Sequence, residues 1–410
     1  MVKISGQSLD NVVIPLPDSA NITSRWPCAQ RAPHWPIAAD QGESHVGEFA
    51  SQRHAAQPSP RPSAANGAHD HGEPFLAADV GGTHARIGLM LGTPGDRQPV
   101  RVLHYHRYHC ADWSDLGSLL RDFVAQLAIA GHAPLQGRIR RCVVASAGVV
   151  LDDAIVNENL PWPVSIAALR EQLGLAQLEV INDFEAVAWA TQFLSVDETL
   201  PVIETAQPAA RGPVLVMGPG TGLGSAVLLP RAGHAQVLPT EAGQIALAPG
   251  NEREIAILRV LARGRAYVSY EDALSGPGLL KLYHALCELR GCPVALMTPA
   301  EVTGAALAGH DAAALETLQV FCGLLGSFTG DLAMLYGASG GVFLAGGILP
   351  QIHGFLRASS FAERYFNKGV MRAFLQKVPV RLIEHGQLGV IGAAGWFLDE
   401  RQGDQAMPPL

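Results

Sequence analysis

Residues 75–91 read FLAADVGGTHARIGLML, and this stretch indicates how the ordered part of the chain begins. An apolar run ends at Asp79-Val80, two glycines and Thr83 follow, and a second apolar run begins at Ile87. Two apolar runs joined by a short glycine turn are typical of a β-hairpin. Residues 214–229 read VLVMGPGTGLGSAVLL and have the same organisation. Because each unit opens a long stretch of further elements, we expect an internally duplicated architecture.

Helix-like and strand-like segments alternate through the rest of the body, which predicts an α/β fold. Helices are expected at residues 113–130, 166–173, 185–193, 252–263, 278–290, 299–308, 311–336, 361–374 and 389–398. Core strands are expected to include residues 141–145, 179–181, 341–344 and 380–382.

Residues 1–73 differ from the body in composition. They are rich in Pro, Ser, Ala, Gln and His, and no apolar period of 2 or 3.6 lasts long enough to form a core element. We expect a disordered or loosely attached N-terminal extension. The alternative is a start codon assigned upstream of the true one.

Composition and charge exclude several classes of function. The chain has 410 residues, 48% hydrophobic and 16% charged, and its net charge is −8. This is a globular composition without the basic footprint of a nucleic-acid-binding protein. None of the four lysines lies in the Gly-Lys-Ser/Thr context of a phosphate-binding P-loop.

Cysteine usage and hydropathy indicate the compartment. The six cysteines are scattered, without CxxC or His/Cys clustering, which argues against a zinc site and a disulfide scaffold. No apolar stretch of 18 residues is free of breakers and charges, and the N-terminus lacks the pattern of a signal peptide. We therefore expect a cytoplasmic protein without a membrane span.

Three glycine-containing segments are candidates for phosphate or nucleotide binding. In the first, Asp79 could hold Mg²⁺ through water and Thr83 could donate to a phosphate, although an ordinary hairpin turn would look the same. The glycines of segment 218–224 would allow close backbone approach to phosphate, or would form a flexible hairpin. A strand ending in Gly346-Gly347 suits a base or ribose, but is also a common strand-to-helix turn.

A fourth segment carries acid–base chemistry. An apolar strand ends at Asn182-Asp183, and a helix begins immediately afterwards. Asp183 could accept a proton from a substrate hydroxyl while Asn182 orients that hydroxyl, or either residue could simply cap the helix. Glu241 and Glu271 could accept pairs of sugar hydroxyls, but alone each would read as a solvated surface residue.

These motifs together resemble the bacterial glucokinase family of the hexokinase/actin-like ATPase group. The resemblance runs in order from about Phe75 to Phe397. It rests on the segments 79–86, 147–148, 159–162, 181–184, 218–224, 241–244, 274–278, 345–348 and 389–392.

The resemblance implies a duplicated actin-like (ribonuclease H-like) ATPase fold with two domains around a central cleft. The domains expected from it are a small α/β domain at 74–180 and a large one at 181–398. A C-terminal helix at about 389–398 would pack back on the small domain, and residues 399–410 would form a flexible tail.

The resemblance also implies ATP-dependent phosphorylation of the 6-hydroxyl group of glucose, a transferase reaction of glycolysis. Asp183 would be the catalytic base, and the sugar would be bound by Asn159, Asn182, Glu241, Gln244 and Glu271. The nucleotide would be bound by Asp79, Gly81, Gly82, Thr83, Gly218, Gly220, Thr221, Gly222, Gly346 and Gly347, with Mg²⁺ held by Asp79 through water. The expected partners are a small-molecule sugar and ATP, with no nucleic acid and no membrane, and a homodimer is expected.

The sequence departs from the family pattern at several positions near the expected site. The pattern Glu-Gly-Gly-His reads Glu241-Ala242-Gly243-Gln244 here, and His84 follows Thr83 where the family has Asn. Gln244 can still donate and accept, and Ala242 would be strained only if its φ were positive. The alternatives are therefore a kinase of a different hexose, or a weak or inactive regulator that binds sugar and nucleotide. Another actin-like phosphotransferase, acting on acyl or polyphosphate groups, fits the sugar-type residues less well.

Overall fold

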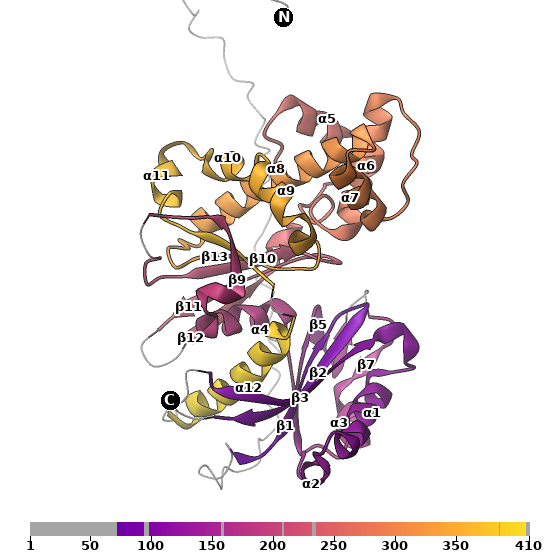
Figure 1. Cartoon of the computed structure of the whole chain (residues 1–410), viewed down its shortest axis with the longest axis vertical. Helices are drawn as coiled ribbons and strands as arrows, with labels where there is room; N and C mark the ends of the chain where they lie inside the picture. Colours follow the sequence, from indigo (N-terminus) through magenta and orange to yellow (C-terminus); the bar gives the residue numbers. More distant parts are fainter. Residues whose placement is uncertain are drawn as a thin grey trace, which may run out of the picture. The chain divides into compact units, whose positions relative to one another are not determined.

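The computed structural model contains two large mixed β-sheets (Figure 1). The two sheets repeat one strand order. The first sheet runs β3 (Val100–His109), β2 (His84–Gly92), β1 (Phe75–Val80), β4 (Arg141–Ser146), β8 (Gln177–Ile181). The second runs β12 (Ala235–Thr240), β11 (Leu223–Pro230), β10 (Val214–Pro219), β13 (Gly341–Leu344), β14 (Val380–Ile383), and then β9 (Thr199–Ile203). In both, an antiparallel hairpin and a third antiparallel strand are followed by two parallel strands. The predicted internal duplication is confirmed.

The structure describes residues 72–93, 98–156, 160–206, 209–231, 235–384 and 386–406. All of them belong to one compact unit that extends from Ala64 to Leu410. The expected N-terminal extension lies outside the described residues, apart from its last two positions. The division of the body into residues 74–180 and 181–398 stays a prediction.

The helices are α1 (Leu116–Ile129), α2 (Ala133–Gln136), α3 (Ile166–Gln172), α4 (Asp183–Ala190), α5 (Glu252–Leu261), α6 (Gly276–Arg290), α7 (Pro299–Ala308), α8 (Ala312–Leu335), α9 (His353–Ala358), α10 (Phe361–Phe366), α11 (Arg372–Leu375) and α12 (Leu388–Ala406). Two predicted helices are wrong in extent. The helix expected at 361–374 is broken between α10 and α11, where Gly369 has a φ of 52°. The C-terminal helix, expected to end at residue 398, continues to Ala406.

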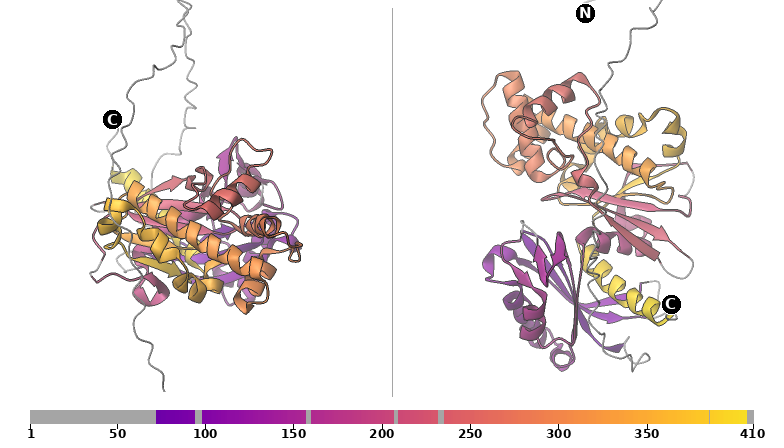
Figure 2. Two further views of the ribbon diagram at one scale, coloured as in Figure 1. Left: turned by 90° about the horizontal axis from the view of Figure 1, so that it is seen from above. Right: turned by 180° about the vertical axis from the view of Figure 1, so that it is seen from behind.

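Opposite faces of the second sheet are covered by α8 and α4 (Figure 2). Leu215 and Met217 of β10 pack in the core that contains α8, whereas Val216 packs with Ala188 of α4. This alternation follows from the two-residue period of a strand. On its other side α4 lies against α12, and a Cβ at Gly392 of α12 would overlap the Ala186 carbonyl.

The face of the first sheet that includes Phe75 and Ala77 is covered by α12. Val390, Ala393 and Phe397 form one buried cluster with these two residues. The C-terminal helix therefore packs on the sheet formed by the first half of the body.

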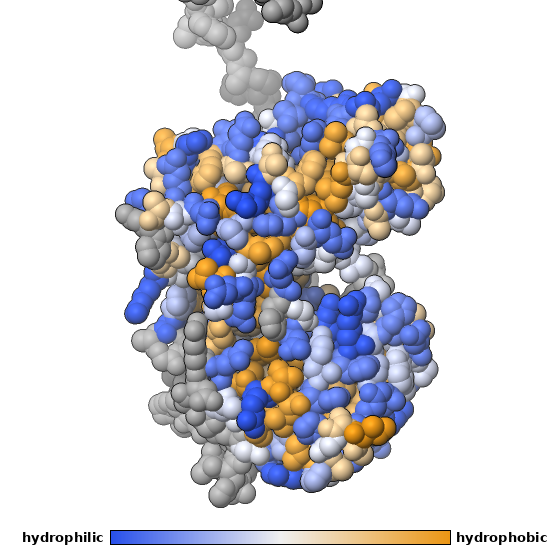
Figure 3. Space-filling model, in the orientation of Figure 1, coloured by the Kyte–Doolittle hydropathy of each residue, from blue (hydrophilic) through white to orange (hydrophobic). Residues whose placement is uncertain are grey.

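One described helix, α8, is long and apolar enough to cross a membrane by length and composition alone. However, 67% of its apolar window is buried inside the protein, as expected for a central core helix. On the viewed face, hydrophilic residues are interspersed with apolar ones (Figure 3).

Candidate active site

The first glycine turn joins β1 to β2 and is fixed by several hydrogen bonds. The Gly81 N–H donates to the His84 carbonyl at 3.0 Å. Cys110 ties the turn to the chain after β3, because its N–H donates to the Thr83 carbonyl at 2.9 Å and its thiol to the Gly81 carbonyl at 3.3 Å. The turn is thus a hairpin turn with additional tertiary restraints.

Asp79 faces Arg86 across this hairpin, and Arg86 Nη1 donates to Asp79 Oδ2 at 3.1 Å. Burial raises the pKa of Asp79, while the Arg86 charge acts in the opposite direction. The sequence reasoning assigned no role to Arg86. The hairpin register could have indicated the contact between Arg86 and Asp79, because a turn that pairs Val80 with Ala85 also pairs residue 79 with residue 86.

The second glycine turn, at the β10–β11 hairpin, is packed mainly against the protein itself. A Cβ at Gly218 would overlap the Ala345 carbonyl, and one at Gly224 would overlap the Phe184 ring. A Cβ at Gly222 would lie 2.6 Å from Glu271 Oε2.

Gly220 differs, because a Cβ there would meet no atom of the described residues within 4 Å. Its carbonyl accepts from the Gly276 N–H of α6 at 2.8 Å, and the neighbouring Thr221 is exposed. Close packing therefore accounts for glycine at positions 218 and 222, whereas the backbone at Gly220 has free space in which a ligand could approach.

Asn182 and Asp183 lie at the N-terminus of α4, directly after β8. Asn182 is the N-cap, and its Oδ1 accepts from the N–H groups of Phe184 at 2.9 Å and Glu185 at 3.3 Å. The capping alternative is thus right for Asn182. Asp183 is the first residue of the helix, and its Oδ1 also accepts from the Phe184 N–H at 2.9 Å.

The surroundings of Asp183 shift the pKa of its carboxyl group upward. Burial raises its pKa to about 7, and the negative charges of Asp79 and Glu241 act in the same direction against the Phe184 N–H. The charge of Asp79, beside the first turn, and that of Glu241 therefore both act on Asp183. A carboxylate with a pKa close to neutral pH can accept a proton under physiological conditions.

A cavity of about 350 Å³ opens beside the N-terminus of α4. Asn182 and Glu241, both expected to bind sugar, line this cavity. Other lining residues, to which the sequence reasoning gave no role, include Glu185, Thr240 and Ser146. Asp183, Gln244 and Glu271 are not among the described residues that line it.

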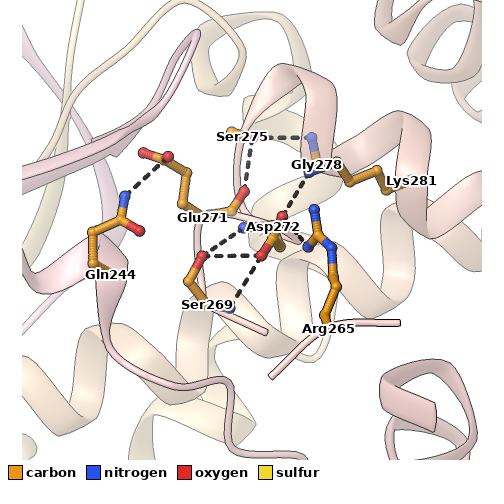
Figure 4. Close-up of polar contacts among 8 residues, drawn as sticks. All are labelled: Gln244, Arg265, Ser269, Glu271, Asp272, Ser275, Gly278 and Lys281. Atoms are coloured by element: carbon orange, nitrogen blue, oxygen red, sulfur yellow. Dashed lines mark hydrogen bonds and ion pairs between the residues drawn. The ribbon is translucent and has the colours of Figure 1, made fainter. Parts of the chain in front are cut away.

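Gln244 and Glu271 contact each other (Figure 4). Gln244 Nε2 donates to Glu271 Oε1 at 3.0 Å, and Glu271 Oε2 accepts from the Leu223 N–H at 2.8 Å. Glu271 therefore links the second glycine turn to the 3₁₀ turn at Ala242–Gln244. The neighbouring Asp272 is occupied by ion pairs with Arg265 and Lys281, at 2.7 and 2.6 Å.

The Ala242 methyl group is accommodated without backbone strain. Ala242 does not have a positive φ, and its side chain is buried in the core of the second sheet. The strain considered for this position therefore does not arise.

The remaining predicted positions lie as follows. Gly346 has a φ of 98°, and a Cβ there would overlap the Pro219 carbonyl, so the end of β13 lies beside the second turn. A Cβ at Gly347 would meet no described atom within 4 Å. Gly82 lies in the first turn, and Asn159 lies outside the described residues.

The described residues contain no cluster of three or more His, Cys, Asp or Glu side chains that could hold a metal ion. A single carboxylate, Asp79, lies at the first turn, with Oδ2 held by Arg86. Mg²⁺ is usually bound through one or two carboxylates, substrate phosphates and several waters. The site therefore fits a water-mediated contact between Asp79 and Mg²⁺, not an all-protein cage.

The duplicated α/β fold and this site define an actin-like ATPase fold of the kind found in sugar kinases. Residues 76–400 match the family model described as Glucokinase, and the chain belongs to the glucokinase family. It is 46% identical over 328 residues to a glucokinase-like protein of Xylella fastidiosa strain 9a5c, covering 80% of this chain and 95% of that one. It is 39% identical over 326 residues to a glucokinase of Chromobacterium violaceum, covering 80% and 90%.

Two solved structures show the same fold. A glucokinase from an Antarctic psychrotroph matches with a TM-score of 0.68 and 34% identity, over 79% of this chain and 98% of that one. A ROK family glucokinase from Streptomyces griseus, in complex with glucose and AMPPNP, matches with a TM-score of 0.52 and 19% identity, over 80% and 99%.

Proposed function

We propose that the protein transfers the terminal phosphoryl group of ATP to the 6-hydroxyl group of glucose, with Asp183 as general base. The observation that carries this proposal is the carboxylate at the N-terminus of α4, whose pKa burial raises to about 7 with the charges of Asp79 and Glu241 acting in the same direction. Phosphoryl transfer needs positioned reactants and a base aligned with the attacking oxygen. Asp183 would accept the proton of the sugar hydroxyl as its oxygen attacks phosphorus.

The other residues would position the two substrates. Asn182 and Glu241 would contact the sugar in the cavity, with Gln244, Glu271 and Asn159 completing its site. The two glycine turns and Gly346-Gly347 would bind the nucleotide. When bound through Asp79, Mg²⁺ would neutralise charge on the phosphates. The Streptomyces griseus glucokinase, in complex with glucose and AMPPNP, supports a sugar and ATP as the small-molecule partners.

Closure of the two expected domains would exclude water, which would otherwise compete with the sugar as phosphoryl acceptor. ATP as donor is in keeping with a cytoplasmic location. The homodimer stays a prediction.

The test is an ADP-release assay over a panel of hexoses with the full chain and the variant Asp183→Asn. Loss of the base should lower kcat by about 10²–10⁴-fold, while calorimetry should still detect glucose binding. The matched control is Asp197→Asn, an exposed carboxylate that should leave kcat unchanged. Turnover that survives intact in Asp183→Asn would refute the assigned base.

A second function, that of a weak kinase or a non-catalytic sugar and nucleotide sensor, is favoured by the Gln244–Glu271 contact. Both Glu271 oxygens accept hydrogen bonds from the protein, so this carboxylate has less capacity for sugar hydroxyls. A kinase with a different hexose preference would be consistent with the same contact. Turnover near 1–100 s⁻¹ on any hexose would exclude the sensor, whereas binding of sugar and ATP without turnover would support it.

A further inference from the structure

Two cysteines lie at the C-terminal end of α6, on either side of the glycine that ends the helix. Gly291 has a φ of 67°, and its N–H donates to the Glu288 carbonyl at 3.0 Å. The Cys292 N–H donates to the Cys287 carbonyl, also at 3.0 Å. These two hydrogen bonds form a Schellman motif, which brings the side chain after the glycine against one in the last turn of the helix. Here both of these side chains carry a thiol.

Helices α1, α3, α7 and α8 end in the same pattern of hydrogen bonds, each with a glycine of positive φ. The two paired positions hold Leu127 and His132 at α1, Arg170 and Leu175 at α3, Ala305 and His310 at α7, and Ala333 and Ala338 at α8. The motif therefore forms without thiols. Of these five helix ends, only that of α6 has cysteine at both positions, so its two side chains can react with each other.

The two thiols differ in exposure and contact each other. Cys287 is fully buried in the core that contains α8, whereas Cys292 is exposed. The other cysteines of the described residues, Cys110, Cys142 and Cys322, are all buried. The thiol groups of Cys287 and Cys292 are in hydrogen-bond contact. A disulfide needs Cα atoms within about 7 Å and Cβ atoms that point together, so the thiol contact and the backbone hydrogen bond provide the geometry of a bridge.

The surroundings of the pair make the exposed thiol the first to react. Burial raises the pKa of the Cys287 thiol, and a thiol reacts as its thiolate, so this group is a poor first nucleophile. Its neighbour Tyr283 accepts from the Ala295 N–H at 3.4 Å and donates to Asp311 Oδ2 at 3.0 Å. The segment that follows Cys292 is thereby anchored to α6, which keeps the two sulfur atoms together.

We propose that Cys287 and Cys292 form a reversible disulfide by exchange with a small-molecule disulfide of the glutathione type. The Cys292 thiolate attacks one sulfur of the small disulfide, whose S–S bond breaks, and one small thiolate leaves. The Cys287 thiol then loses its proton to solvent, and its sulfur attacks Cys292 Sγ and expels the second small thiolate. The protein gives up two protons and two electrons, and the small disulfide is reduced to two thiols.

The predicted bond is labile and not a structural staple. It closes only a short loop, and a disulfide constrains the unfolded chain less as the loop becomes shorter. One of its sulfur atoms comes from an exposed residue, and exposed disulfides are the ones that exchange readily. The exchange uses none of the residues assigned to sugar or nucleotide, so the inference does not depend on the proposed function.

Intact-mass measurement of the full chain after incubation with oxidised glutathione tests the proposal. The parent carries Cys28→Ser, a substitution outside the described residues that leaves the five described cysteines in place. The parent should lose the mass of two hydrogen atoms and regain it with dithiothreitol. Cleavage after Glu288 and Glu301 releases Cys292 on a peptide without another cysteine, and the disulfide should join this peptide to the one that contains Cys287.

Single variants of the parent test the order of the two steps. Cys287→Ala should retain one glutathionyl group on Cys292, because no second thiol is present to displace it. Cys292→Ser should show no change at Cys287, because that thiol is fully buried. The matched control is Cys142→Ala, a buried cysteine of β4 in the other sheet, which should form the disulfide as the parent does.

Two results would overturn the proposal. One is a stable glutathione adduct on Cys292 of the parent while Cys287 stays a free thiol. The other is a parent chain whose mass does not change under the oxidant. Neither result bears on the kinase, because hexose turnover is measured separately on the reduced chain.

Discussion

The two glycine turns occupy equivalent places in the duplicated topology, yet their surroundings differ. The first turn has ionisable neighbours, namely Asp79, whose pKa is raised by burial, and Arg86. The second turn is surrounded by close packing, with the backbone of Ala345 against Gly218 and the Phe184 ring against Gly224. The duplication has thus kept the backbone path while the surroundings diverged: an ion pair lies beside the first turn, whereas the second is enclosed mainly by packing and holds Glu271 through the Leu223 N–H.

Helix α4 relates the two turns through adjacent residues. Asp183 is affected electrostatically by Asp79 beside the first turn, and Phe184 covers Gly224 in the second. The N–H of Phe184 in turn donates to Asp183 Oδ1. The candidate base is therefore held where the charged and the packed halves of the site meet.

The largest effect expected from this arrangement is the pH dependence of catalysis. Because Asp183 must be ionised to accept a proton and its pKa is raised to about 7, kcat/KM should fall about tenfold per pH unit below 7. The measurement is the pH profile of kcat/KM for glucose between pH 5 and pH 9. A profile that is flat from pH 5 to pH 8 would show that Asp183 is not the general base. The charged groups at the first turn would then have no effect on catalysis through Asp183.

The same pKa shift predicts that stability falls as pH rises, whereas kcat/KM rises. The folded chain holds a proton on Asp183 up to about pH 7, whereas the ordinary pKa is 3.8, so the free energy of unfolding should decrease as pH rises between these values. Each pKa unit corresponds to about 1.4 kcal/mol. Asp183→Asn should therefore be more stable than wild type at pH 8 and similar to it at pH 4, measured by urea unfolding. If Asp183→Asn and wild type were equally stable at pH 8 as well as at pH 4, the pKa of Asp183 would not be raised.

A smaller effect separates packing from ligand contact within the second turn. Gly218→Ala should destabilise the fold by about 1–3 kcal/mol, because the new methyl group meets the backbone at Ala345, which cannot rotate away. Gly220→Ala is the matched control, since its Cβ has free space and its φ is not positive. This variant should keep or gain up to about 1 kcal/mol of stability but bind AMPPNP more weakly.

Thermal melting and calorimetry on both variants measure this difference. Equal destabilisation of the two variants would show that the second turn is packed throughout. Unchanged AMPPNP affinity in Gly220→Ala would remove Gly220 from the nucleotide site.

The sequence predicted the elements that depend on local patterns. Both hairpins, the α/β alternation and the position of Asp183 at the end of a strand follow from apolar runs and glycine turns. Strand β3 was missed because His and Arg alternate along it, so its apolar face is narrow. The pairing of β3 with β2 was therefore not visible either.

Contacts between distant segments could not be predicted. Glu271 lies 48 residues from Leu223, to which it is hydrogen-bonded, and no local pattern indicates that pairing. Glycine density alone does not separate packing from ligand contact, because the close approach of Gly218 to Ala345 and of Gly222 to Glu271 is visible only in the tertiary structure. The nucleotide contacts expected at these two glycines stay predictions.

The smallest effect expected concerns the link between the second turn and the sugar site. Gln244→His introduces the residue of the family pattern and removes the present amide donor to Glu271. Because Leu223 still donates to the other carboxylate oxygen, the free energy of unfolding should fall by only about 0.5–1.5 kcal/mol.

The steady-state constants for glucose report whether that contact restrains the site. If it competes with sugar hydroxyls, Gln244→His should lower KM for glucose by about 2–10-fold, the equivalent of one hydrogen bond, with little change in kcat. The matched control is Gln376→His, an exposed glutamine at the end of α11, which should leave KM unchanged. A higher KM in Gln244→His would instead mean that Gln244 itself contacts the sugar. Glu271 would then only support the second glycine turn, and Gln244 would be the residue of this pair that contacts the sugar.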